Sequence, residues 1–238
     1  MIDNDLFGKC SQPEFVGVTL LDTIGLVIPS VEKALKEKAN IPEDIASVGL
    51  ISSRTGAAGQ IIAADEAVKA TNSSVISIEL PRDTKGWGGH GNFIMLGGKT
   101  VCDARRAVEI SLELCEKHAG EVYISDAGHL EFAFSSSAGE ALSFAFDAPK
   151  GRAFGFVAAS PAAIGFVLAD VVLKSYSVEL LKYMSPSVGT SHSNEVIIAF
   201  TGETSDVKSA VTGARERGME MLTALGSIPK SPGKPYII

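Results

Sequence analysis

Hydrophobic and polar positions follow the same order twice along this chain, at a spacing of about 105 residues. In the first half, an apolar run at residues 48–51 predicts a strand. Residues 61–69 (IIAADEAVK) then predict a helix, because good helix formers surround one apolar face. Residues 154–157 and 167–174 repeat this strand and this helix, with alanine, aspartate and lysine in register. The chain therefore contains two copies of one α/β unit.

The repeat continues through the rest of each half. Apolar and β-branched runs predict further strands, at residues 75–80 and 93–98 in the first half and at residues 178–183 and 196–202 in the second. Helices are then predicted to begin at Asp103 and Asp206, whose carboxylates can cap free N–H groups at the positive end of the helix dipole. Residues 28–35 and 135–142 match loosely, so the repeat also includes an element before the first strand pair.

These elements predict an α/β (α+β) fold of two similar domains, each a mainly antiparallel sheet flanked by helices. A helix over residues 104–117 is predicted to end at His-Ala-Gly, residues 118–120, which places the domain boundary there. Three prolines within residues 227–235 exclude a helix and indicate an extended tail. The expected division is an N-terminal tail at residues 1–12, a first domain at 13–119, a second domain at 120–228 and a C-terminal tail at 229–238.

The composition narrows the partners of such a protein. A formal net charge of -7 and the lack of a basic run exclude a general nucleic-acid binder, since phosphate contacts need clustered Lys and Arg. Cys10, Cys102 and Cys115 form no CxxC pair, so we expect no disulfide framework, no zinc site and a reducing cytoplasm. Charged and helix-breaking residues interrupt the apolar stretch at 153–173, and no signal-peptide pattern precedes the first domain. We therefore predict no membrane span.

Two motifs suggest chemistry that their surroundings do not support. Gly86, Gly88 and Gly91 have the spacing of a dinucleotide-binding loop, but a strand follows where a helix N-terminus would hold the pyrophosphate. His90 and His192 lie in equivalent loops near serine or aspartate, which leaves a hydrolase open as a third hypothesis. Neither a nucleophile elbow nor an HExxH motif accompanies them. We expect hydrogen bonding within the loops, with no catalytic residue, no metal and no cofactor.

Small residues precede the first long helix of each half, at residues 56–59 and 160–163. They allow a close backbone approach, and the sequence leaves open whether that approach lies within a domain or between subunits. Lys69 and Lys174 lie at the matching ends of these helices, where a cation stabilises the negative end of the helix dipole.

The region from residue 13 to residue 237 shows a more specific resemblance, which several phrases carry. They are DTIGLVI (22–28), AADEAVKATN (63–72), ELPRDTKG (79–86), AGHLE (127–131), LKS (173–175) and SPSVGTSHSNE (185–195). In these phrases the chain resembles the trimeric, tandem-domain shell proteins of bacterial microcompartments, of the propanediol- and ethanol-utilisation type.

The resemblance implies two circularly permuted BMC domains per chain and three chains per pseudohexameric tile. Tiles would pack edge to edge with other shell proteins. A loop of each domain would border pores for small polar metabolites, a role that suits glycine and hydroxyl residues because they leave little bulk and expose polar groups. The predicted pore-lining residues are Arg82, Asp83, Thr84, Lys85, Gly86, Trp87, Gly88, Gly89, His90, Gly91, Pro186, Ser187, Val188, Gly189, Thr190, Ser191, His192 and Ser193.

The resemblance also implies a structural function without catalysis, in the cytoplasm. Lys69 and Lys174 match the lysine that such tiles use for tile-edge packing. Trp87 departs from the small residues usual in this loop, and a bulky ring there would narrow a pore, so a closed or gated pore is a hypothesis. The alternative function is a small-molecule-binding module with its ligand held between the two domains.

Overall fold

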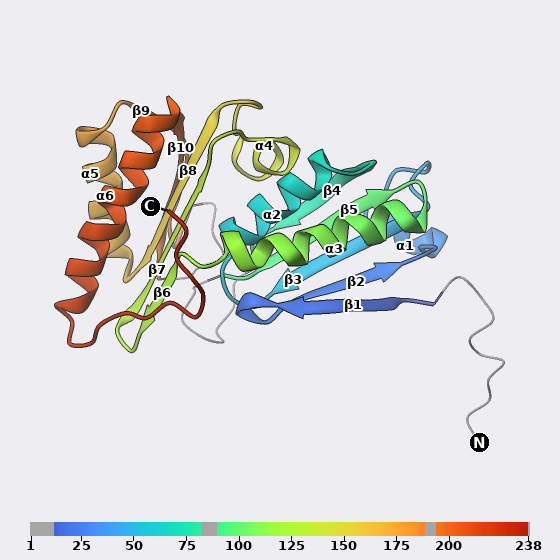
Figure 1. The fold of residues 1–238 in the computed structure, drawn as a ribbon, viewed down its shortest axis with the longest axis horizontal. Coiled ribbons are helices and arrows are strands. Elements are labelled where there is room, and N and C mark those ends of the chain that lie inside the picture. The colour runs from blue at the N-terminus through green and yellow to red at the C-terminus, as the bar shows by residue number, and fades with distance from the viewer. Residues whose placement is uncertain (1–11, 82–89, 189–193, 238) are drawn as a thin grey trace, which may run out of the picture.

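The chain forms two similar α/β units that lie side by side (Figure 1). This computed structural model describes residues 12–81, 90–188 and 194–237. The first unit contains strands β1 (Glu14–Thr19), β2 (Thr23–Ile28), β3 (Ser47–Ser53), β4 (Ser73–Glu79) and β5 (Asn92–Gly98), helices α1 (Lys33–Lys38), α2 (Ala58–Lys69) and α3 (Val101–His118), and the short 3-10 helix η2 (Leu20–Asp22). The second contains β6 (Val122–Ser125), β7 (Gly128–Ser135), β8 (Ala153–Ser160), β9 (Val178–Met184) and β10 (Val196–Gly202), with helices α4 (Glu140–Phe146), α5 (Ala162–Ser175) and α6 (Thr204–Thr223).

Each unit is built on an antiparallel five-stranded sheet with the same strand order. The orders are β1-β2-β3-β5-β4 and β6-β7-β8-β10-β9. The agreement includes irregularities, because β4 and β9 each place one extra residue, Ile76 and Leu181, opposite the neighbouring strand. The repeat predicted from the sequence is confirmed. Strand register makes Gly49 equivalent to Gly155. The first residues of α1 and α4, Lys33 and Glu140, are equivalent by their place in each unit.

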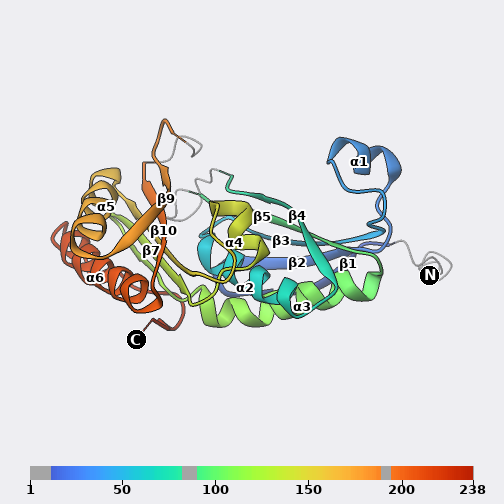
Figure 2. The same cartoon turned by 90° about the horizontal axis from the view of Figure 1, so that it is seen from above.

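The helices cover the sheets in the same way in both units. Helix α3 packs along the first sheet and α6 along the second, while α2 and α5 occupy equivalent places beside them (Figure 1). Helix α1 lies on the face of the first sheet opposite to α3 (Figure 2). No helix among the described residues is long and apolar enough to cross a membrane.

One of the hydrophobic clusters of the structure is shared by the two units. Helix α4 of the second unit packs against α2 and β4 of the first. Ile61 and Leu96 of the first unit belong to the same buried cluster as Leu142, Phe146 and Phe156 of the second, and each is 0% exposed. The orientation of one unit relative to the other is therefore fixed by continuous apolar packing.

The C-terminal segment is extended and packs along the second unit. Lys230 exchanges backbone hydrogen bonds with Ile124 of β6. Further on, the N–H groups of Tyr236 and Ile237 each donate to Glu121 Oε1 at 2.7 Å. This buried carboxylate thus fixes the end of the chain beside the sheet.

Two predicted helix starts were wrong by about one half-turn. Helix α3 begins at Val101, before the predicted Asp103, because Thr100 is its N-cap and accepts the N–H of Asp103 at 3.2 Å. The backbone N–H of Thr100 donates to the Asp103 carboxylate at 3.3 Å, which completes a capping box. Helix α6 begins at Thr204, which places Asp206 in its first turn. A carboxylate in the first turn of a helix stabilises the helix N-terminus, as a carboxylate at the N-cap position does.

Candidate functional site at the junction of the two units

A buried carboxylate of the first unit caps a helix of the second. Asp65 lies on α2 and is 0% exposed. Its two oxygens accept the N–H groups of Gly139 (2.8 Å), Ala141 (2.8 Å) and Leu142 (3.1 Å). These are free donors at the start of α4, whose own N-cap, Gly139, has no side chain to satisfy them. Asp65 of the first unit therefore caps the N-terminus of α4 in the second unit, a role that an N-cap residue of the same helix normally has.

Lys69, one turn along α2, completes this contact. Its Nζ lies 2.9 Å from Asp65 Oδ2 and 2.9 Å from Glu66 Oε1, and it donates to the carbonyl oxygen of Ser137 at 2.6 Å. Burial opposes the charge of Lys69, but hydrogen bonds and charges of Glu66 and Asp65 raise its pKa. Lys69, predicted at the tile edge, thus bridges the two units within one chain.

A second buried contact joins the residues that precede the two return strands. His90 lies before β5, and Glu195 lies before β10. The ring nitrogen Nδ1 of His90 lies 2.6 Å from Glu195 Oε1, and His129 Nε2 of β7 lies 2.9 Å from Glu195 Oε2. The His90 and Glu195 side chains are 1% and 0% exposed. One carboxylate of the second unit is therefore shared by a histidine from each unit.

Glu131 of β7 extends this cluster to α2. Its Oε1 accepts the N–H groups of Ala57 (3.0 Å) and Ala58 (2.8 Å) at the start of that helix. Its Oε2 lies 3.6 Å from His90 Nε2. The carboxylate meets the positive end of the helix dipole and a cation together, and both stabilise its charge.

The charges of this cluster support one another. Burial disfavours a charged imidazole, but the charge and hydrogen bond of Glu195, with the charge of Glu131, outweigh it and raise the pKa of His90 to about 9. Burial likewise disfavours the Glu195 carboxylate, but His90 and His129 hold its pKa well below the usual range. At neutral pH the His90–Glu195 contact is therefore a buried ion pair.

The junction also fixes the ends of the two predicted pore loops. The N–H of Gly91 donates to the Pro81 carbonyl at 2.8 Å, which brings the two ends of the first loop together. Ser185 and Val188 exchange backbone hydrogen bonds of 2.7 and 3.1 Å at the start of the second loop. No group of three or more His, Cys, Asp or Glu side chains within residues 12–81, 90–188 and 194–237 is arranged to hold a metal ion.

The predicted pore residues are described in part. Residues 82–89 and 189–193, which include Trp87 and His192, lie outside the described residues. Ser187 and Val188 are exposed, Pro186 is half-buried, and Gly91 is buried. The imidazole of His90 is buried at the junction, and the predicted place of this residue at the pore border stays a prediction. Burial of this side chain follows from its pairing with Glu195, a partner that lies far away in the sequence.

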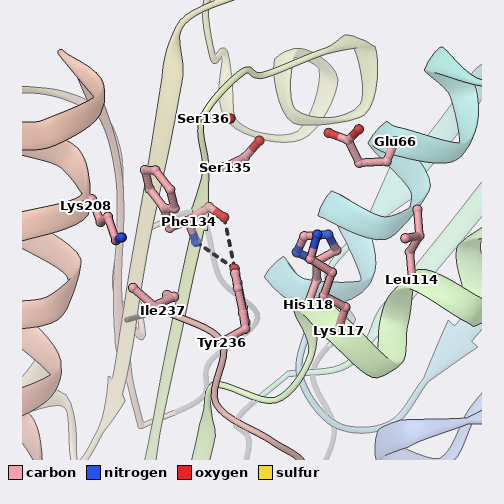
Figure 3. A pocket seen from close by; sticks show the side chains of 10 residues that line it. All are labelled: Glu66, Leu114, Lys117, His118, Phe134, Ser135, Ser136, Lys208, Tyr236 and Ile237. Atoms are coloured by element: carbon pink, nitrogen blue, oxygen red, sulfur yellow. Dashed lines mark hydrogen bonds between the residues drawn. The ribbon is translucent and has the colours of Figure 1, made fainter.

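A cavity of about 380 Å³ opens between the units on the side of the C-terminal segment (Figure 3). Tyr236 forms one wall, where its hydroxyl bonds the N–H and carbonyl of Phe134 at 3.0 Å each. His118 lies beside Tyr236, with the two ring centroids 5.1 Å apart. Burial and the charge of Lys117 lower the pKa of His118 to about 4. The full lining is Glu66, Leu114, Lys117, His118, Phe134, Ser135, Ser136, Lys208, Tyr236 and Ile237. This cavity is where a ligand held between the domains would lie.

Comparison with known proteins identifies the repeated unit. The family model of the BMC domain matches residues 47–126 and again residues 153–231. The chain belongs to the BMC-domain family. Among curated members, the bacterial microcompartment shell protein PduB of Salmonella typhimurium is 48% identical over 229 residues, which are 96% of this chain and 85% of that protein.

Solved BMC-domain structures agree with this assignment over nearly the full chain. The crystal structure of EtuB from Clostridium kluyveri superposes with a TM-score of 0.90 at 47% identity, covering 93% of this chain and 97% of EtuB. The crystal structure of a trimeric PduB shell protein gives a TM-score of 0.90 at 43% identity, covering 94% and 100% of the two chains. The predicted family and fold class, two BMC domains with antiparallel sheets and helices, are confirmed.

Sequence reasoning missed most of the residues that hold the two BMC domains together. Glu131 and Glu195 lie within phrases that carried the family resemblance, but no role was assigned to them. A charge inside an apolar strand such as HLEFAF (129–134) was an available signal, because a buried charge needs a partner. The sequence left open whether the small residues before α2 allow a close approach within a domain or between subunits. At Gly59 a Cβ would lie 2.5 Å from Ala119 Cα. That close approach lies within the first domain.

Proposed function

We propose that this protein is a structural shell protein of a bacterial microcompartment, which assembles as a trimeric, pseudohexameric tile. The observation that supports this most is the pair of BMC domains fixed on one shared core. Three such chains present six similar domains, which suits a six-sided tile in a closed ring. Similarity to PduB and EtuB along nearly the whole chain supports the same role.

In such a tile, residues 82–91 and 186–193 are the proposed pore borders. The His90 side chain is buried, so this residue would contribute its backbone. Small polar metabolites would cross these pores while they form hydrogen bonds with exposed backbone and hydroxyl groups. Lys174 and Lys69 are the proposed tile-edge residues, toward other shell proteins. Lys174 is the more available of the two, with its side chain 73% exposed against 34% for Lys69.

The proposal includes the cytoplasm as the setting and a role without catalysis. Domain limits at 13–119 and 120–228, with tails at either end, remain part of it. The alternative, a module that binds a ligand between its domains, is less favoured. The cavity at the junction exists, but the similarity to shell proteins extends far beyond any one pocket.

Negative-stain electron microscopy of the purified protein over a range of concentrations tests the proposal, with light scattering to give the mass in solution. We expect three chains per particle, hexagonal outlines and ordered sheets at high concentration. A monomer at every concentration would overturn the shell assignment and favour the ligand-binding module.

A further inference from the structure

The cavity beside the C-terminal segment carries an excess of positive charge, although the chain as a whole has a formal net charge of -7. Lys117 of α3 and Lys208 of α6 both line it (Figure 3). Neither lysine forms an ion pair within the described part of the chain. The carboxylate of the lining, Glu66, is already matched by Lys69, whose Nζ lies 2.9 Å away. This balance of charge favours a negatively charged ligand.

His118 adds a buried polar group that the fold leaves without a partner. The residue is 9% exposed, and neither ring nitrogen has a hydrogen bond with the described residues. Burial and the charge of Lys117 hold the pKa of His118 at about 4, so the ring is neutral near pH 7 and carries one N–H. Because protein atoms cover Nδ1, Nε2 is the nitrogen that a ligand can reach. An imidazole with its proton on Nε2 donates to an anion in the cavity.

The C-terminal wall of the cavity is fixed by hydrogen bonds of its own. Glu121, which is 1% exposed, accepts the N–H groups of Tyr236 and Ile237. Arg215 donates to both oxygens of Glu121 at 3.1 Å and to the carbonyl oxygen of Ile237 at 2.7 Å. A wall that is already ordered loses little conformational entropy when a ligand binds against it.

The internal repeat does not reproduce the imidazole of this cavity. Helices α3 and α6 align through a fully buried Ala-Val pair in each, at residues 107–108 and 210–211. In this alignment Met221 of α6 takes the place of His118. The polar group is therefore particular to one position in the chain.

The two lysines depart from the repeat as well. In the same alignment Glu220 takes the place of Lys117, and it pairs with an arginine one turn earlier at 2.8 Å. Arg105 takes the place of Lys208, and it pairs with the carboxylate of Glu14. The repeated fold thus has paired charges where the cavity has unpaired cations. Folding alone does not explain this combination of residues.

We propose that this cavity binds a small organic anion, one molecule per chain. Its carboxylate or phosphate group accepts the Nε2–H of His118 and is stabilised by Lys117 and Lys208. Its hydroxyl groups bond the hydroxyls of Ser135 and Ser136, which also line the cavity. The volume of about 380 Å³ lies within the range of about 300–1,000 Å³ that is typical of small-molecule sites.

This site is separate from the proposed pore borders. Ser135 is the last residue of β7, whereas His129, near the start of that strand, bonds Glu195 close to the second loop. Every lining residue belongs to one chain, so the site does not require the trimer. The inference therefore goes beyond the proposed shell function, and either of the two can fail while the other stands.

Isothermal titration calorimetry of the full chain with three probes tests the proposal. Glycerol 3-phosphate and glycerate carry a phosphate and a carboxylate on similar small bodies, and glycerol has the hydroxyl groups without the charge. We expect at least one of the two anions to bind at one site per chain, and the comparison between them identifies the preferred anionic group. Absence of binding by both anions would overturn the proposal.

Variants then locate the bound anion. Lys208→Gln removes a cation of the lining, and His118→Phe keeps a ring but removes its N–H. We expect each change to weaken binding of the anion at least about tenfold, because a hydrogen bond or contact with a charged group is lost. Glycerol should bind no more weakly to either variant than to wild type.

The matched control is Lys150→Gln, which removes the same charge from an exposed residue outside the cavity. This change should weaken binding about twofold at most, since exposed and distant charges are screened. An equal loss in Lys150→Gln and Lys208→Gln would show that the anion responds only to overall charge and would overturn the site. Glycerol binding that is lost in His118→Phe would show that the cavity selects an uncharged ligand, and the assigned ligand class would be wrong.

Discussion

The buried ionic residues of this chain are arranged so that each carboxylate has more than one partner. Glu195 meets two imidazoles, Glu131 meets a helix N-terminus and His90, and Asp65 meets three N–H groups. Removing one member of such a set leaves a buried charge without some of its partners. This destabilises the fold more than replacing the whole set with apolar residues would. The residues that join the two domains are therefore expected to be among the least tolerant positions of the chain.

The His90–Glu195 pair makes stability depend on pH in a specific direction. The pKa of His90 is raised in the folded chain, so its stabilisation is complete below the unfolded value near 6.5 and is lost as the pH rises through about 9. We expect His90→Gln to lower the free energy of unfolding by about 3 kcal/mol at pH 6. That difference should shrink as the pH approaches 10.

Guanidinium unfolding of wild type and variant from pH 5 to 10 measures this difference. His118→Gln is the control, because the pKa of His118 is lowered to about 4, which confines its own contribution to lower pH. The effect of that control should not vary between pH 7 and 10. A His90→Gln penalty that is constant with pH would show that the pair is not ionised in the folded chain.

At the scale of elements, the pattern of apolar positions predicted most strands and the long helices, because each has one face that must be buried. Helix starts were predicted less well, because both threonine and aspartate are favoured N-cap residues. The sequence does not show which of Thr100 and Asp103 is the N-cap of α3 and which lies in its first turn. Helices α1 and α4 were matched only loosely. Their sequences differ because α4 is buried by the first domain and α1 is exposed.

The cap that Asp65 provides to α4 is testable as a contact between elements. Asp65→Ala removes the acceptor of three N–H groups, and we expect a loss of about 2–4 kcal/mol in the free energy of unfolding. Asp170→Ala makes the same change at the equivalent, half-exposed position. Both are measured at a protein concentration low enough that copies of the chain do not associate. Equal losses for the two would mean that α4 does not depend on Asp65.

At the scale of the whole molecule, the repeat was readable because its strands, glycines and the Asp–Lys pair of each long helix keep their spacing. The candidate site was not readable to the same degree. The residues that meet at the junction, such as His90 and Glu195, are 105 positions apart, and nothing local marks them as partners. The predicted pore-lining residues were inferred from the family resemblance. That resemblance did not indicate that the His90 side chain is buried.

The shared core also sets an order of events during synthesis. When the first domain leaves the ribosome, Ile61 and Val68 of α2 have no cover until α4 and β8 have followed them. Uncovered apolar surface on a nascent chain is prone to aggregation, and it persists until its partner arrives. The first domain therefore completes its folding only after much of the second domain has been synthesised.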